Sequence, residues 1–163
     1  MGRIYQQTGI DAYSNFGFAK VYTNKKAGSA IDFVKTKVIP VYGMFNISLD
    51  RILTDNGKEY TTHWVGAKHD YEISLAKCGI THTNIKLGCP KSNGMVERLN
   101  RTFLEEFYQI VMLKKVYTSL DKLQNDLDSF IYYYNFKRTN QGYRFKGKIP
   151  YQKFIEGKRK LAL

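Results

Sequence analysis

The amino-acid sequence predicts an α/β domain in which a mixed sheet is flanked by helices. Short segments rich in Tyr, Ile, Val and Phe occupy the first half of the chain and are typical of strands. Apolar residues recur at helical spacing through the second half. Turn-forming residues separate these segments. Strands mixed with helices should therefore come first, and long helices should follow.

The first half should form short elements whose boundaries are set by turn residues, glycine and proline. The expected elements are an antiparallel hairpin of residues 4–12 and 16–23 around Ser14-Asn15, a helix over 27–38 ended by Pro40, a strand over 47–54 whose apolar run 51–53 looks buried, a helix over 70–78 with Ile73, Leu75 and Ala76 inward and Gly79 as C-cap, and a strand over 80–85.

The second half begins with a predicted loop, residues 86–92, and continues with two helices. The first should run from Val96 to about Lys114, and the second should start at Ser119, which is a good N-cap. Beyond residue 135 the periodicity stops. We therefore expect a core over residues 1–135 and a basic C-terminal arm over residues 136–163.

The formal net charge of +12 is concentrated in the second half. Residues 86–163 carry sixteen Lys/Arg against seven Asp/Glu, and beyond residue 136 the one acid is Glu156. Such an excess favours a polyanionic partner, because neutralising phosphates releases condensed counterions. A solubilising basic tail would produce the same composition, and charge alone leaves both interpretations open.

The two cysteines, Cys78 and Cys89, make no disulfide framework. No apolar segment is long enough to span a bilayer, and the N-terminus lacks a signal-peptide pattern. These observations predict an intracellular, cytoplasmic protein that does not associate with membranes.

Two carboxylates are candidate functional groups. Asp55 follows the predicted strand and precedes Asn56-Gly57, a turn pair that exposes the preceding side chain. It could instead serve only to start that turn. Glu97 lies near the start of the long helix, at the border of its buried face. It could instead be a solvated residue paired with Arg101, which contributes only ~0.3–0.5 kcal/mol.

Four spaced motifs resemble those of retroviral-type integrases and insertion-sequence transposases, and together they cover residues 4 to about 156. The matching segments are 10–16 (IDAYSNF) with the hairpin (V/I)DxYSRF, 54–60 (TDNGKEY) with TDNGxEF, 91–102 (KSNGMVERLNRT) with QxNGxVERxNRT, and 133–138 (YYNFKR) with Pro150 for the closing YNxxRPH…TP. Asn15 and Asn140 depart from the usual arginine and histidine of these motifs.

This resemblance implies a ribonuclease-H-like fold and two-metal phosphoryl transfer in DNA integration or transposition. In that family three carboxylates, the D-D-E triad, hold two Mg²⁺ (or Mn²⁺) ions. Matched by motif, Asp55 would be the second acid and Glu97 the third. The resemblance also implies DNA as a partner, together with a homo-oligomer or an intact transposase.

The first acid of the triad belongs to a strand that precedes the hairpin, in a W-x-x-D-x-T setting. The chain begins only ten residues before Asp11, so we expect it to lack this strand and to be N-terminally truncated. Asp11 matches the hairpin aspartate, which is not catalytic, and its side chain should face elsewhere. Two carboxylates without the third should bind metal weakly. The alternative function is therefore a non-catalytic DNA-binding transposase fragment.

Basic and polar residues near Glu97 and at the start of the arm are candidate DNA contacts, although a solvated face would use the same residue types. The candidates are Lys86, Lys91, Asn93, Arg98, Arg101, Lys137 and Arg138. A zinc site is disfavoured, because the spacings of the remaining metal-ligating residues match no standard pattern. Those residues are His63, His69, Cys78 and Cys89.

Overall fold

The computed structural model describes residues 2–62, 67–85, 94–143 and 145–161. The chain divides into two units, which are described in turn. Unit 1 comprises Thr8–Val21 and Met95–Leu163, and unit 2 comprises Gly2–Gln7 and Tyr22–Gly94. The predicted core and arm, divided at residue 135, differ from these units and remain a prediction.

Strands β1 (Tyr5–Ile10) and β2 (Gly17–Tyr22) form a two-stranded sheet, which confirms the predicted hairpin. Its turn is held by Asp11, whose carboxylate accepts hydrogen bonds from the Ser14 N–H at 2.7 Å and the Ser14 hydroxyl at 2.5 Å. Asn15 has φ of 57°, a left-handed conformation that asparagine adopts more readily than most residues. These local contacts fix where the chain reverses.

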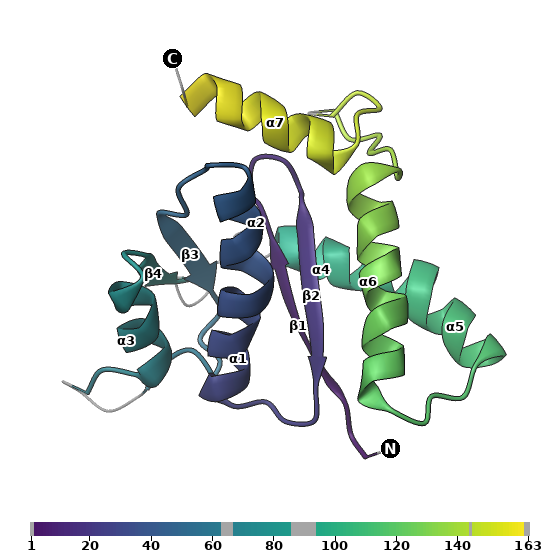
Figure 1. The fold of residues 1–163 in the computed structure, drawn as a ribbon, viewed down its shortest axis with the longest axis horizontal. Coiled ribbons are helices and arrows are strands. Elements are labelled where there is room, and N and C mark those ends of the chain that lie inside the picture. The colour runs from purple at the N-terminus through teal and green to yellow at the C-terminus, as the bar shows by residue number, and fades with distance from the viewer. Residues whose placement is uncertain (1, 63–66, 86–93, 144, 162–163) are drawn as a thin grey trace. The chain divides into compact units, whose positions relative to one another are not determined.

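In unit 1 the predicted helix over residues 96–114 is confirmed. It consists of α4 (Gly94–Thr102), a π-helical segment (Phe103–Tyr108) and α5 (Gln109–Lys114), which follow one another without a break (Figure 1). Leu99, Phe103 and Phe107 are buried. Their helical spacing forms the apolar stripe that anchors this helix.

Helix α6 (Leu120–Phe136) starts where predicted, with the Ser119 hydroxyl accepting a hydrogen bond from the Lys122 N–H at 3.3 Å. It lies beside β2 (Figure 1) and bonds to its backbone. The Asn135 carboxamide accepts from the Gly17 N–H at 2.7 Å and donates to the Gly17 carbonyl at 2.8 Å. The Gln124 carboxamide accepts from the Val21 N–H at 2.8 Å. These bonds join α6 to the hairpin.

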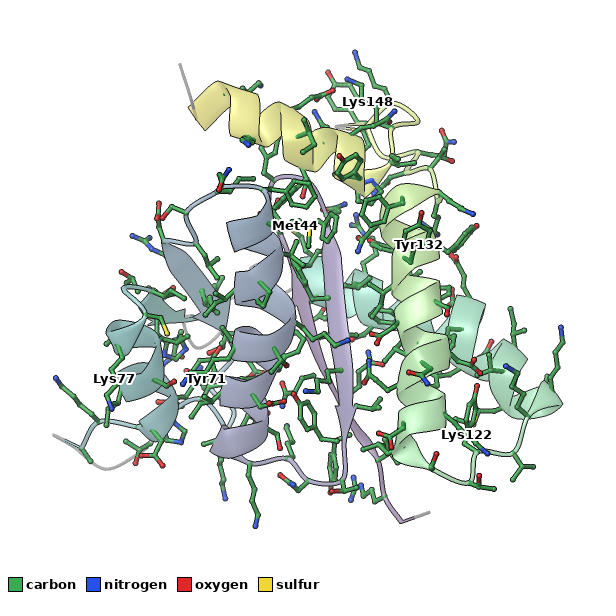
Figure 2. All side chains as sticks on the ribbon, in the orientation of Figure 1. Met44, Tyr71, Lys77, Lys122, Tyr132 and Lys148 are labelled. Carbon is green, nitrogen blue, oxygen red and sulfur yellow. The ribbon has the colours of Figure 1, made fainter. Side chains whose placement is uncertain are left out.

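Helix α7 (Pro150–Leu161) was not expected in the predicted arm. Its apolar residue Phe154 is buried, and the Phe154 ring lies 5.1 Å from the Phe16 ring. Lys153 donates to Glu156 at 3.1 Å, and Lys148, labelled in Figure 2, also pairs with Glu156. Aromatic packing and internal ion pairs therefore order part of the basic C-terminal region.

In unit 2 the helix predicted to end at Pro40 continues to Met44, so that prediction was wrong. Helix α1 (Ala27–Phe33) leads into a π-helical segment (Val34–Val38) and then α2 (Ile39–Met44). Pro40 lies in the first turn of α2, where proline is tolerated because the N–H it lacks would have no intrahelical partner there.

Strands β3 (Arg51–Thr54) and β4 (Thr81–Asn84) pair in parallel, and the strand predicted over 47–54 is shorter than expected. The interpretation of β3 as buried was wrong, because Leu53 is 50% exposed. Burial alternates along β3, as expected when successive side chains point to opposite faces and one face stays open. The described strands thus form two two-stranded sheets.

Helix α3 (Asp70–Lys77) confirms the predicted helix, and Gly79 follows it with φ of 71°. Of the three residues expected to face inward, Leu75 is buried while Ile73 and Ala76 are exposed. Tyr71 provides the other buried contact, on the side of α3 that packs against α1 (Figure 2). None of the helices among the described residues is long and apolar enough to cross a membrane.

Candidate active site

Asp55 directly follows β3, at the carboxyl end of the parallel pair, and its side chain is exposed. Its Oδ1 accepts a hydrogen bond from the Gly57 N–H at 2.9 Å, so the turn-starting interaction considered from the sequence is present. The Asn56 Nδ2 donates to the Ile85 carbonyl at 3.2 Å. The turn therefore holds the carboxylate in one orientation while leaving it open to solvent.

Polar contacts from β4 support the end of β3. The Thr54 Oγ1 lies 2.8 Å from the His82 Nε2 and 3.1 Å from the Asn84 Oδ1. The His82 Nδ1 lies 3.6 Å from a carboxylate oxygen of Glu72. Burial lowers the pKa of His82, and the opposing effect of Glu72 does not reverse the shift. A neutral imidazole is thus favoured beside Thr54.

A second carboxylate, Glu59, lies close to Asp55. A Cβ added to Gly57 would be 2.9 Å from the Asp55 Oδ1 and 2.7 Å from the Glu59 Oε2, so both oxygens approach the same point. Glu59 is 5% exposed and pairs with the Lys25 ammonium at 3.0 Å. Sequence reasoning assigned it no role, and its place in the TDNGxEF signature was the signal available.

The negative charges of Asp55 and Glu59 affect the neighbouring Tyr60 hydroxyl. The Tyr60 hydroxyl donates to the Gln7 Oε1 at 2.6 Å. Burial raises the pKa of Tyr60 far above its usual value, and the negative charges of Glu59 and Asp55 raise it further. Tyr60 is consequently a neutral hydrogen-bond donor at neutral pH.

Glu97 lies in the first turn of α4, and its side chain is exposed. Its neighbour Leu99 is almost fully buried and fixes the rotation of the helix. The pairing with Arg101 considered from the sequence is replaced by another contact, because the Arg101 Nε lies 4.0 Å from the Glu105 Oε1. Asp55 belongs to unit 2 and Glu97 to unit 1, so bringing the two together remains a prediction.

The structure gives Asp11 a role in the hairpin turn through its bonds to Ser14. Within the described ranges there is no group of three or more His, Cys, Asp or Glu side chains that could hold a metal ion. His69 caps α3 by accepting from the Tyr71 N–H at 3.2 Å. Cys78, the last residue of the helix predicted over 70–78, is exposed and directly follows α3. His63 and Cys89 lie outside the described residues.

The predicted DNA contacts fall into three groups. Arg98, Arg101 and Lys137 are exposed. Arg138 is half-buried and donates two hydrogen bonds to the Glu106 carboxylate, at 2.8 and 2.6 Å. The others lie outside the described residues: Lys86, Lys91 and Asn93.

Part of the sequence is similar to known proteins. Residues 78–144 match the family described as integrase core domain. The ORF3 protein of Spiroplasma virus SpV1-C74, named as a candidate integrase, is 29% identical over 146 residues, which cover 84% of this chain. The chain spans 38% of the length of that relative.

Two solved structures share the fold. The catalytic core domain of BIV integrase aligns with a TM-score of 0.69 and 18% identity, over 99% of this chain and 92% of that one. The HTLV-2 integrase catalytic core domain, solved with magnesium in a trimeric form, aligns with a TM-score of 0.63 and 16% identity, over 91% of this chain and 82% of that one. The ribonuclease-H-like α/β fold predicted from the sequence is confirmed. The chain is thus similar to integrase core domains in the sequence of residues 78–144 and in its fold.

Proposed function

We propose that the chain acts on DNA in integration or transposition, through metal-dependent phosphoryl transfer in which Asp55 and Glu97 supply carboxylate oxygens. One observation carries the proposal: Asp55, in the motif shared with integrases, ends a parallel strand with its carboxylate exposed and oriented by the Gly57 N–H. An exposed but fixed carboxylate is suited to a hard cation.

The residues present fit Mg²⁺ (or Mn²⁺). Only one Asp55 oxygen is engaged by the turn, and Glu97 makes no ion pair with any described residue. Such ions, when bound, stabilise negative charge on the transferring phosphoryl group. Asp55 would orient a ligand oxygen from the rigid strand end, and Glu97 would present one from the first turn of α4. The magnesium complex of the HTLV-2 core supports this choice of metal.

DNA would be held by the basic second half of the chain. We assign phosphate contacts to the exposed side chains of Arg98, Arg101 and Lys137, and to Lys86, Lys91 and Asn93 in the segment before α4. Arg138 would contribute less, because Glu106 neutralises it. The trimeric HTLV-2 core supports a homo-oligomer, and an intact transposase is the other candidate partner. The proposed location is the cytoplasm, with the nucleoid.

The 163-residue chain taken by itself should catalyse poorly. Two of the three carboxylates that the resemblance implies are identified, and Asp11 is bonded to its own turn. A non-catalytic DNA-binding fragment of a transposase is therefore the second candidate function. It is favoured by the positive charge of residues 86–163, which suits DNA binding without catalysis.

The test is Mg²⁺-dependent nicking of DNA by the purified chain, beside Asp55→Asn and Glu97→Gln variants. We expect weak nicking that each substitution abolishes, because removing either carboxylate charge removes a metal ligand. Ser48→Ala, a substitution on an exposed hydroxyl in unit 2, serves as the control and should leave nicking unchanged.

Absence of nicking together with salt-dependent DNA binding would reject the catalytic proposal and support the DNA-binding fragment. Nicking that survives both substitutions would show that other residues catalyse it. Loss of salt-dependent DNA binding would reject both functions.

A further inference from the structure

Unit 1 contains a cavity of about 360 Å³ that the proposed chemistry does not use. It lies among the hairpin turn, α4, the end of α6 and the segment that follows it. The lining residues, none of which is acidic, are Ile10, Asn15, Met95, Arg98, Leu99, Thr102, Tyr134, Arg138, Thr139, Asn140, Gln141 and Gly142. All of them belong to unit 1.

Asn15 is the most unusual member of this lining. It is 9% exposed, and its backbone N–H donates to the Asp11 carbonyl at 2.9 Å. Its carboxamide has no hydrogen-bond partner among the described residues, although it lines the cavity. Among the described residues the fully buried polar atom without a partner is the Tyr13 hydroxyl, so the Asn15 carboxamide is not fully buried. Its donor and acceptor are therefore open to the cavity, where a polar ligand can bond to them.

Arg98 provides an unneutralised positive charge. Its side chain is exposed at the cavity and has no ion-pair partner in the described parts of the chain. Arg138 differs, because its guanidinium is bonded to Glu106 and lies 5.7 Å from the centre of the Tyr134 ring. The cavity therefore combines one available cation with a structural ion pair.

The segment after α6 that lines the cavity is held by its own hydrogen bonds in the absence of a ligand. The Asn140 N–H donates to the Lys148 carbonyl at 3.0 Å, and the Gly147 N–H donates to the Asn140 carbonyl at 3.1 Å. The Asn140 Oδ1 accepts from the Gly142 N–H at 3.1 Å, which leaves its Nδ2 to donate. Pre-formed polar groups fix a ligand's orientation without an ordering cost.

We propose that this cavity binds one unpaired nucleotide of a DNA strand, with its phosphate at Arg98 and its base against the carboxamides of Asn15 and Asn140. Carboxamides donate and accept, as base edges do, whereas a phosphate alone needs only donors. The volume and the apolar wall formed by Ile10, Met95 and Leu99 suit a base better than a bare ion. This inference rests on the proposed function, since it assumes a DNA substrate.

The test is a Mg²⁺-free NMR titration of the full chain with dAMP, dCMP, dGMP and dTMP, beside deoxyadenosine and inorganic phosphate. At least one nucleotide should shift the side-chain amide signals of Asn15 and Asn140. Arg98→Gln should weaken that binding about ten-fold, as expected for a lost charged hydrogen bond. Asn15→Gly keeps the left-handed turn while removing the carboxamide, and should weaken binding several-fold.

Lys114→Gln is the matched control, because it removes an exposed charge further along the same continuous helix and does not line the cavity. It should bind as the unchanged chain does. Nucleotides that shift neither carboxamide would overturn the inference, as would phosphate binding as tightly as every nucleotide. Salt-dependent binding of duplex DNA is measured on the same samples. If it persists when nucleotide binding fails, the cavity inference fails and the proposed function stands.

Discussion

Asp55 and Glu97 are the two carboxylates of the proposed chemistry, and their surroundings are built from different interactions. Around Asp55 the contacts are polar: the Gly57 N–H orients the carboxylate, and His82 and Asn84 meet the preceding Thr54. Around Glu97 they are apolar, because α4 is anchored by Leu99 and continues into a buried aromatic stripe. Hydrogen bonds fix a side chain's direction, whereas apolar packing fixes the position of a whole helix. Substitutions near Asp55 should therefore mainly change the orientation of its carboxylate. Substitutions in the helix that carries Glu97 should mainly change the free energy of unfolding.

The largest effect is expected from the apolar stripe that continues from α4. Phe103→Ala should lower the free energy of unfolding by about 3–5 kcal/mol, because Phe103 is 1% exposed and its ring packs against Phe130. Urea denaturation followed by circular dichroism measures it. Leu104→Ala, at the exposed next position, is the control and should cost less than about 1 kcal/mol. Equal losses of stability in both variants would contradict the view that buried apolar packing fixes the helix that carries Glu97.

A smaller loss of stability is expected on substituting Asn135, a buried polar residue of unit 1. Asn135→Ala should cost roughly 2–4 kcal/mol, because it leaves the Gly17 N–H and carbonyl without their partners. Asn125→Ala, exposed on the same helix, should change stability by less than about 0.5 kcal/mol in the same urea experiment. An unchanged free energy of unfolding in Asn135→Ala would mean that the Asn135 hydrogen bonds do not stabilise the contact between α6 and the hairpin.

Substitution of Gly57 tests whether the polar contacts of the turn orient the Asp55 carboxylate. Gly57→Ala should cost only about 1 kcal/mol of stability, since the clashing oxygens are at the ends of flexible side chains. It should still displace Asp55 and Glu59. Broadening of the Asn56 NMR signals by Mn²⁺ should then need at least about ten-fold more metal. Gly43→Ala, whose Cβ would meet nothing within 4 Å, should leave the Mn²⁺ response unchanged. Unchanged broadening in Gly57→Ala would show that Asp55 does not hold the ion.

The smallest effect is a pH dependence from His82. Its folded pKa lies below the ordinary 6.5, so the unfolded chain takes up a proton first as the pH falls. The stability that His82 contributes is thus present above pH 6.5 and is lost below it. Urea unfolding at about pH 7.5 and about pH 5.5 measures the difference. His82→Gln should reduce it, and an unchanged pH dependence would contradict the assignment.

Much of the fold could be predicted because long helices repeat their apolar residues. The helix carrying Leu99 and Phe103, and α6 behind Ser119, follow from periodicity and capping. Helix α7 could not be predicted in this way, because it lies in a basic segment and Phe16, the aromatic partner of Phe154, is distant in sequence. Pro40 was misjudged because a preceding π-helical segment places it in a first helical turn.

The candidate site was predictable only from motifs. Asp55 and Glu97 were identified by resemblance, and their local placement agrees with the strand end and helix start expected for them. Glu59 could not be assigned, because its burial and its approach to Gly57 depend on the folded turn. The cavity of Asn15 and Arg98 depends likewise on segments remote in sequence.

The carboxamides of α6 have a consequence for the hairpin's solubility. Asn135 and Gln124 occupy backbone groups of β2 at Gly17 and Val21, which a further strand would otherwise use. An unprotected strand of this kind is a template for pairing with another chain, and therefore for aggregation. A helix that offers amide groups in place of a neighbouring strand satisfies β2 without extending the sheet. Helix α6 thus disfavours the addition of another strand to β2. This matters in a chain whose family resemblance implies assembly with other copies.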